Sequence, residues 1–115
     1  MPSTPAETSD EDRRERYERV LRIVAYQTGG PQRPLTPDRV VRMLACRAGY
    51  DPDDVRSSLQ AAVENGDLLR TAREGRTLYA RTDDESLQAV VLAEVERDDV
   101  DQDLIGRCYT LMGGP

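Results

Sequence analysis

The chain is 115 residues long, which suits one domain with one hydrophobic core. It carries 22 acidic residues against 16 basic ones, giving a formal net charge of −6, and it contains no His, Phe or Trp. Because nucleophilic catalysis and zinc sites usually draw on His, the composition argues against an enzyme and predicts neither a cofactor nor a metal ion.

The two cysteines, Cys46 and Cys108, stand alone, since neither belongs to a Cys-x-x-Cys pair. We expect both to be small buried thiols in a reducing cytoplasm. No run is long and apolar enough to span a membrane, and the N-terminus lacks a signal-peptide core. The sequence therefore predicts a cytoplasmic protein.

All basic residues are arginine, and aspartate is abundant. A GC-rich genome, as in many soil bacteria, favours arginine codons over lysine codons. A salt-filled cytoplasm favours carboxylates and screens their mutual repulsion. The many aspartates favour the second cause, and the composition resembles that of haloarchaeal proteins.

The first expected elements are a lead-in and a helix. Residues 1–10 are polar and show no period, so they predict a disordered segment. Residues 11–28 predict a helix, because apolar residues recur there at helical spacing. These apolar positions are Tyr17, Val20, Leu21 and Val24. Glycines and prolines in residues 28–34 end this helix.

Two further helices begin with a capping oxygen followed by proline. The capping residues are Thr36 and Asp51. The helix after Thr36 should end at Gly49, and the helix after Asp51 should end at Asn65 and Gly66, because these residues favour the backbone of a helix C-terminus.

The period then changes from helical to extended. Residues 67–71 and 77–81 predict the strands of a hairpin, joined by a tight turn that contains Gly75. A capping box over residues 82–85, with Thr82 as its cap, starts a fourth helix, and a last helix covers about 101–112. The predicted fold is mainly α with a small β-hairpin, an α+β class.

The connection between the second and third expected helices is short, Ala48 to Asp51, and contains a glycine, which is the helix-turn-helix signal. A hairpin follows directly. Residues 51–81, with Glu-Asn-Gly-Asp-Leu-Leu at 64–69, resemble the winged-helix DNA-binding superfamily. The resemblance covers about residues 12–81. It implies that the third helix enters the major groove of DNA while the hairpin lies along the backbone.

The expected organisation has three parts. A disordered lead-in occupies 1–10, a winged-helix domain occupies 11–81, and a C-terminal extension of two helices occupies 82–115. We expect the third helix and the hairpin to form one convex surface that tolerates phosphate.

Candidate base-reading residues lie on the outward face of the third helix: Arg56, Ser57 and Gln60. Arg can pair with guanine, Gln with adenine, and Ser with a base or a phosphate. The alternative is an ordinary solvated face. Asp51, Asp53 and Asp54 at the start of this helix would repel phosphate, which favours a protein-binding role instead.

Candidate backbone contacts cluster on the hairpin, where four arginines stand against one glutamate in residues 70–81. These arginines are Arg70, Arg73, Arg76 and Arg81. Positive charge gathered on one part of an acidic protein is what a phosphate-contacting surface needs. The alternative is that these arginines pair with nearby carboxylates such as Asp83 and Asp84.

Salt weakens phosphate contacts, so a protein that binds DNA in a salt-filled cytoplasm is expected to dimerise. The last two helices could supply the dimer interface. Four phosphate contacts imply a slope of roughly −3.6 in log K against log salt, so a doubled binding surface would help. The candidate interface residues are Leu87, Val91, Val95, Leu104, Ile105, Tyr109 and Met112. The alternative is that these residues cover the core of the same chain.

The function predicted from the sequence is a winged-helix protein that binds double-stranded DNA as a homodimer. It would be a small transcription regulator of a halophilic archaeon or of its virus or plasmid. The alternative is a winged-helix protein–protein interaction module or an accessory subunit of a larger assembly.

Overall fold

The computed structural model describes residues 10–27 and 34–113, and these form five helices and three strands. The elements are α1 Asp10–Gln27, β1 Thr36–Pro37, α2 Asp38–Arg47, α3 Pro52–Glu64, β2 Leu68–Arg73, β3 Arg76–Arg81, α4 Asp84–Val95 and α5 Gln102–Leu111. The chain is thus mainly helical with a small antiparallel sheet, which confirms the α+β class. The predicted lead-in lies outside the described residues, except for Asp10, which begins α1.

Helix α3 begins as predicted, because the Asp51 carboxylate accepts a hydrogen bond from the Asp53 amide at 2.9 Å. The prediction that Thr36 caps α2 is wrong. Thr36 lies in β1, and its buried hydroxyl donates to the Val24 carbonyl of α1 at 3.3 Å. The Thr36 hydroxyl thus satisfies a buried carbonyl near the end of α1, and it does not cap α2 as the local sequence pattern predicted.

The turn between α2 and α3 has the predicted form. Gly49 adopts a φ of 101°, and the Tyr50 amide donates to the Ala45 carbonyl at 3.2 Å. Such a left-handed residue satisfies the last carbonyls of α2 and turns the chain sharply. The two helices are therefore joined by a short, hydrogen-bonded turn.

The predicted cap of the fourth helix is displaced by one residue. Asp83, not Thr82, caps α4 by accepting from the Ser86 amide at 3.0 Å. The Thr82 hydroxyl instead donates to the Gly66 carbonyl at 2.7 Å, which ties the end of β3 to the start of β2.

The sheet has the strand order β1-β3-β2, and both pairings are antiparallel. The predicted hairpin is confirmed, with Glu74 and Gly75 at φ values of 53° and 76°, as a tight two-residue hairpin loop requires. Strand β1 is a new finding. Its two residues pair Thr36 with Tyr79 and are too short to leave a periodic signal.

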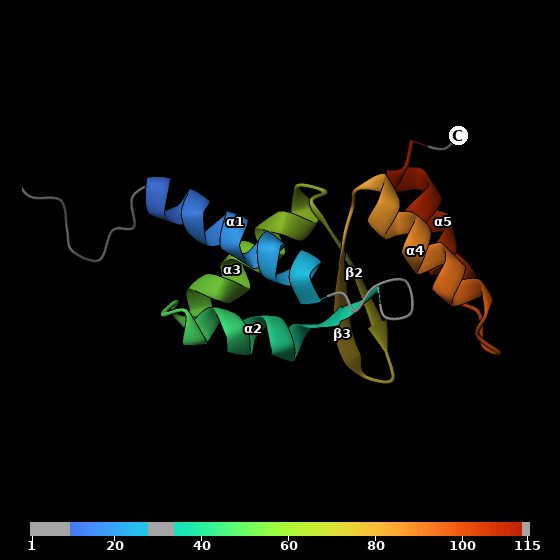
Figure 1. The fold of residues 1–115 in the computed structure, drawn as a ribbon, viewed down its shortest axis with the longest axis horizontal. Coiled ribbons are helices and arrows are strands. Elements are labelled where there is room, and N and C mark those ends of the chain that lie inside the picture. Colours follow the sequence, from blue (N-terminus) through green and yellow to red (C-terminus); the bar gives the residue numbers. More distant parts are fainter. Residues whose placement is uncertain (1–9, 28–33, 114–115) are drawn as a thin grey trace, which may run out of the picture.

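The sheet lies between two helical layers, with α1, α2 and α3 on one side and α4 and α5 on the other (Figure 1). Neighbouring strand residues point to opposite faces, so Leu68 and Tyr79 join the first layer while Leu69 and Ala80 join the second. The first core consists of Val20, Val24, Val41, Ala45, Val55, Leu59, Ala62, Leu68 and Tyr79. The second consists of Leu69, Ala80, Leu87, Val90, Val91, Leu104 and Cys108. The single core expected from chain length is thus divided in two by the sheet.

The second core contains residues that the sequence assigned to a dimer interface. Leu87 and Leu104 are fully buried inside the chain and Val91 is 9% exposed, so these side chains are not available to a second copy. Ile105 and Met112 pack against the same core. Val95 and Tyr109 do stay exposed.

No helix in the two described stretches has both the length and the apolar character that crossing a membrane requires.

Candidate functional site

The outward face of α3 is exposed as predicted. Arg56, Ser57 and Gln60 are exposed, whereas Val55 and Leu59 are buried against the other helices. Gln60 donates to the Glu64 carboxylate at 3.2 Å. Within the described residues, Arg56 and Ser57 have no hydrogen-bond or ion-pair partner, so both are free to meet a ligand.

Two of the three carboxylates at the start of α3 have partners in the structure. Arg16 of α1 donates through Nε to the buried Ser58 hydroxyl at 2.8 Å, and its Nη1 lies 3.7 Å from the Asp54 carboxylate. The Asp51 carboxylate is engaged in capping its own helix. Sequence reasoning missed Arg16, although a serine among the inward positions of α3 signals a buried donor facing it.

The hairpin arginines do not all share one face of the sheet. Arg70 is opposite Tyr79 and Arg81 is opposite Leu68, and directly opposed residues share a face. Because Tyr79 and Leu68 belong to the first core, Arg70 and Arg81 lie on the α1–α3 side. Arg73 lies on the other side, where it forms an ion pair with a carboxylate of α4. Arg73 therefore does not share a surface with Arg70 and Arg81.

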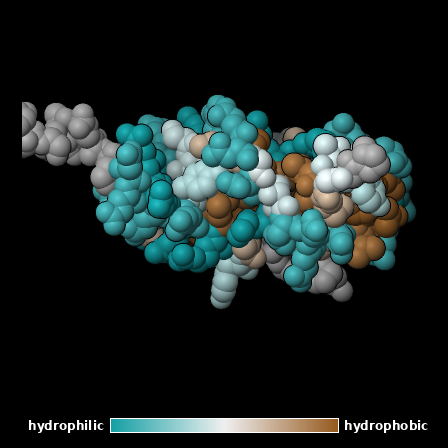
Figure 2. Space-filling view, turned by 90° about the horizontal axis from the view of Figure 1, so that it is seen from above, coloured by the Kyte–Doolittle hydropathy of each residue, from teal (hydrophilic) through white to brown (hydrophobic). Residues whose placement is uncertain are grey.

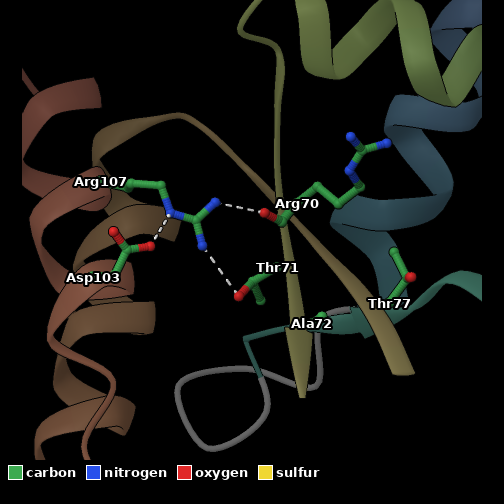
Figure 3. A pocket seen from close by; sticks show the side chains of 6 residues that line it. All are labelled: Arg70, Thr71, Ala72, Thr77, Asp103 and Arg107. Atoms are coloured by element: carbon green, nitrogen blue, oxygen red, sulfur yellow. Dashed lines mark hydrogen bonds and ion pairs between the residues drawn. The ribbon is translucent and has the colours of Figure 1, made fainter. Parts of the chain in front are cut away.

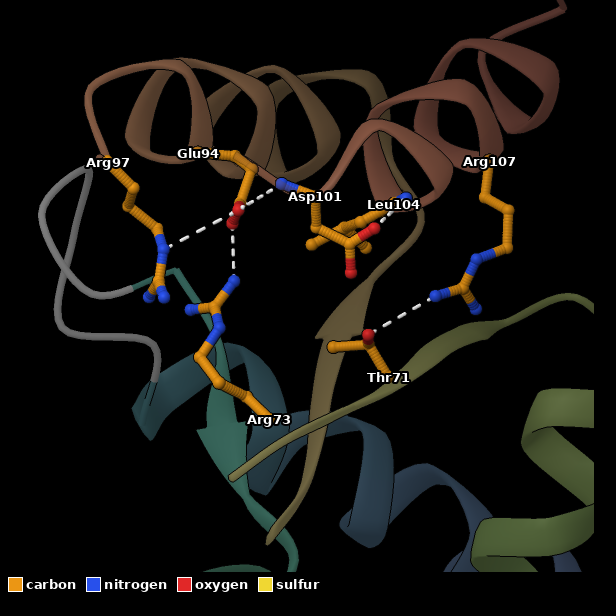
Figure 4. A network of polar contacts seen from close by, with 7 residues as sticks. All are labelled: Thr71, Arg73, Glu94, Arg97, Asp101, Leu104 and Arg107. Atoms are coloured by element: carbon orange, nitrogen blue, oxygen red, sulfur yellow. Dashed lines mark hydrogen bonds and ion pairs between the residues drawn. The ribbon is translucent and has the colours of Figure 1, made fainter. Parts of the chain in front are cut away.

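Arg73 is held by a buried carboxylate. Its guanidinium forms an ion pair with Glu94 of α4, which is 2% exposed (Figure 4). The other Glu94 oxygen accepts from the Asp101 amide at 2.9 Å and lies 3.5 Å from Arg97. Arg73 thus pairs with a carboxylate, which is the alternative that the sequence left open for the hairpin arginines. Its partner is Glu94, not Asp83 or Asp84.

Arg81 lies near a carboxylate that the sequence did name. Burial works against ionisation of Asp83, but hydrogen bonds from Ser86 and the charge of Arg81 lower the pKa of that carboxyl below its usual value. Arg81 is half-buried, whereas Arg70 and Arg76 are exposed.

Arg107 of α5 covers the free edge of β2. It donates to the Arg70 carbonyl at 2.7 Å and to the Thr71 hydroxyl at 3.2 Å, and its Nε lies 3.1 Å from Asp103 (Figure 3). A cleft of about 410 Å³ runs beside these residues. The Arg70 side chain points away from Arg107, toward the α1 side of the sheet.

Arg76 remains exposed at the hairpin turn. With Arg39 and Arg42 of α2 it lines a hollow of about 230 Å³. This grouping has no signature in the sequence, because the hollow joins segments almost forty positions apart that the pairing of β1 with β3 brings together.

The two ends of the molecule differ in surface character. Hydrophobic side chains gather at the α4–α5 end, whereas the α1–α3 end is mainly hydrophilic (Figure 2). The exposed large apolar residues of α4 and α5 are Leu92, Val95, Tyr109 and Leu111.

The aspartates around the start of α5 have structural partners. Asp101 caps α5 through the Leu104 amide at 3.1 Å, and Asp103 pairs with Arg107. In the part of the chain that the structure describes, no three His, Cys, Asp or Glu side chains are grouped as metal ligands.

Comparison of the chain with protein-family models, with curated proteins and with solved structures finds no match.

Proposed function

We propose that the chain is a winged-helix protein that binds double-stranded DNA and acts as a small transcription regulator. The order of its elements supports this proposal. A helix pair with a short glycine turn, α2 and α3, is followed at once by the β2–β3 hairpin. In helix-turn-helix proteins the second helix of such a pair lies in the major groove.

The observation that carries the proposal is that exposed arginines on the helix pair and hairpin have no ion pair. Arg16, Arg42, Arg73, Arg97 and Arg107 each have a carboxylate partner. Arg56, Arg70 and Arg76 are exposed, with no carboxylate partner among the described residues. The same holds for arginines of α1: Arg13, Arg14 and Arg22. In a chain with 22 acidic residues, exposed cations without an ion pair are suited to an anionic ligand.

We assign two kinds of DNA contact to these residues. Arg56, Ser57 and Gln60 contact base edges, where a guanidinium can fork onto guanine and an amide onto adenine. Arg70 and Arg76, with Arg81 at the margin, contact the phosphate backbone. We do not assign a DNA contact to Arg73, because its guanidinium is engaged in the ion pair with Glu94.

A binding titration on genomic DNA fragments at several salt concentrations tests the proposal. We expect Arg56→Ala to weaken binding to the preferred fragment by about 1–3 kcal/mol and to relax its sequence preference. The matched control is Arg47→Ala, since Arg47 is also an exposed arginine but ends α2. The proposal is wrong if no fragment binds, or if both variants lose affinity equally.

A second candidate function is a protein-interaction module, and one observation favours it. Leu92 of α4 is 63% exposed and Val95 is 52% exposed, so the last turns of this helix present two large apolar side chains to solvent. Neighbouring exposed apolar residues on a helix can mark a surface that a partner covers. If a second copy of the chain covers these two side chains, the protein is a homodimer. If another protein covers them, the chain is a protein-interaction module.

Sedimentation at high salt separates these possibilities. A dimer that Leu92→Asp converts to a 12.9 kDa monomer supports self-association, with Gln88→Asp on the same exposed side as the control. A wild-type monomer at all concentrations rules out the homodimer.

A further inference from the structure

A cationic hollow lies between the first turn of α2 and the hairpin turn. Its walls are Pro37, Asp38, Arg39 and Arg42 on one side and the segment 75–77 on the other, around a volume of about 230 Å³. The pairing of Pro37 with Leu78 holds the two walls together. Strand pairing therefore fixes the backbone segments that form the two walls of the hollow.

Three arginines and one carboxylate residue, Asp38, line this hollow, and Asp38 already has partners. Asp38 Oδ2 lies 2.7 Å from Arg42 Nε, and Asp38 Oδ1 accepts a hydrogen bond from the Tyr79 hydroxyl at 3.0 Å. Burial, together with the Asp38 charge, raises the pKa of Tyr79 to about 12, so this hydroxyl remains a donor at neutral pH. Each Asp38 oxygen thus has a partner, and neither partner is one of the other two arginines of the hollow.

Those two arginines are Arg39 and Arg76. Both are exposed, and neither has an ion pair or side-chain hydrogen bond to another described residue. The backbone adds to the positive character, because Pro37 at the N-cap of α2 offers no side-chain acceptor to the first amides of the helix. Free amides at a helix start and paired guanidinium groups both favour phosphate oxygens.

We propose that Arg39 and Arg76, supported by Arg42, clamp one phosphate group in this hollow. Resting on the proposed function, we infer that the phosphate is a backbone phosphodiester of the bound DNA. Such a contact fixes the position of the duplex against α2 and the hairpin turn and carries no base preference. Arg39 and Arg42 thereby join a binding surface for which the sequence offered only α3 and hairpin residues.

The anion site can be tested without DNA by titrating inorganic pyrophosphate and following backbone amide resonances. We expect saturable shifts at Gly75, Thr77 and Arg39, with binding about tenfold weaker in Arg39→Gln and in Arg76→Gln. Arg47→Gln, at the other end of α2, should leave the titration unchanged. Amide spectra outside the hollow show whether each variant remains folded. The proposal fails if these amides do not respond or if all three variants behave alike.

DNA titrations at varied salt then identify the source of the phosphate. Loss of one contact should lower the slope of log K against log salt by about 0.9 in Arg39→Gln without changing sequence preference. If the wild type binds DNA and Arg39→Gln binds it with the same salt slope, the hollow does not hold a backbone phosphate, and the proposed function survives. If pyrophosphate binds in the hollow while no DNA binds, the DNA-binding function is wrong and the hollow is a site for a free phosphate anion.

Discussion

The Arg73 guanidinium on β2 lies against the Glu94 carboxylate on α4, and this ion pair fastens the hairpin tip to the C-terminal helices. Glu94 is almost fully buried and holds Arg97 and the Asp101 amide as well. One carboxylate thus organises three segments: the hairpin, the end of α4 and the start of α5.

Replacing the buried carboxylate should destabilise the fold. Glu94→Gln leaves the Arg73 and Arg97 charges without a counter-charge, and breaking a buried pair typically costs about 3 kcal/mol of unfolding free energy. Urea unfolding followed by circular dichroism measures this loss. Glu96→Gln, at an exposed neighbouring position, should change the unfolding free energy by less than about 0.5 kcal/mol. Equal effects of the two variants would show that the Glu94 pair contributes little.

Arg70 and Arg73 should respond oppositely to alanine substitution, although both belong to the hairpin. Arg73→Ala should lower thermal stability, because Glu94 loses its ion-pair partner, but should leave the salt dependence of DNA binding unchanged in the folded protein. Arg70→Ala should spare stability and lower that dependence by about 0.9. Unfolding curves paired with salt titrations measure both quantities. A reduced salt slope in Arg73→Ala would mean that Glu94 releases Arg73 to DNA.

Removing Arg107 should expose the edge of β2. Its guanidinium covers the Arg70 carbonyl, and bare strand edges promote pairing between chains. We expect Arg107→Ala to self-associate in light-scattering measurements and to lose about 1–2 kcal/mol of unfolding free energy. Asp103→Ala is the control, because it removes the Asp103–Arg107 ion pair and keeps both bonds from Arg107 to β2. A monodisperse Arg107→Ala would refute this role.

Alkaline pH should weaken the fold through Tyr79. Its pKa is about 12 in the folded chain against 10.0 for an unperturbed tyrosine, so ionisation is harder in the folded state. The corresponding stabilisation is complete below pH 10 and is lost as the pH rises toward 12, by about 2.7 kcal/mol for two pKa units. Thermal unfolding across this range should show a shallower decline in Tyr79→Phe than in wild type. Tyr26→Phe, at an 82% exposed position, should follow the wild type.

Local features of the fold were predictable, because their determinants lie within a few residues. Asp51 caps α3 through an amide two positions away, and Gly49 ends α2 by its own backbone conformation. Thr36 could not be placed in this way, since its strand partner Tyr79 and its acceptor Val24 are distant in sequence. Its position before a proline favoured the cap, and the tertiary contact prevailed.

The same distinction applies to the candidate site: features set by neighbouring residues could be predicted, and contacts between residues far apart in the sequence could not. The exposure of Arg56 follows from helical period alone, and the separation of Arg70 from Arg73 follows from strand alternation, so both could be derived from the sequence. Glu94 could not be identified as the partner of Arg73, because the sheet and α4 bring them together across 21 positions. The grouping of Arg39 with Arg76 depends on β1, which has no sequence signature.

The position of the sheet between two cores also bears on how the molecule unfolds. Leu68 and Leu69 are adjacent in the chain but serve opposite cores, so neither helical layer can detach without leaving an apolar strand face in water. Folding should then be a single cooperative transition for all five described helices. A fragment cut after residue 81 would expose Leu69 and Ala80 to water, so we expect it not to fold on its own.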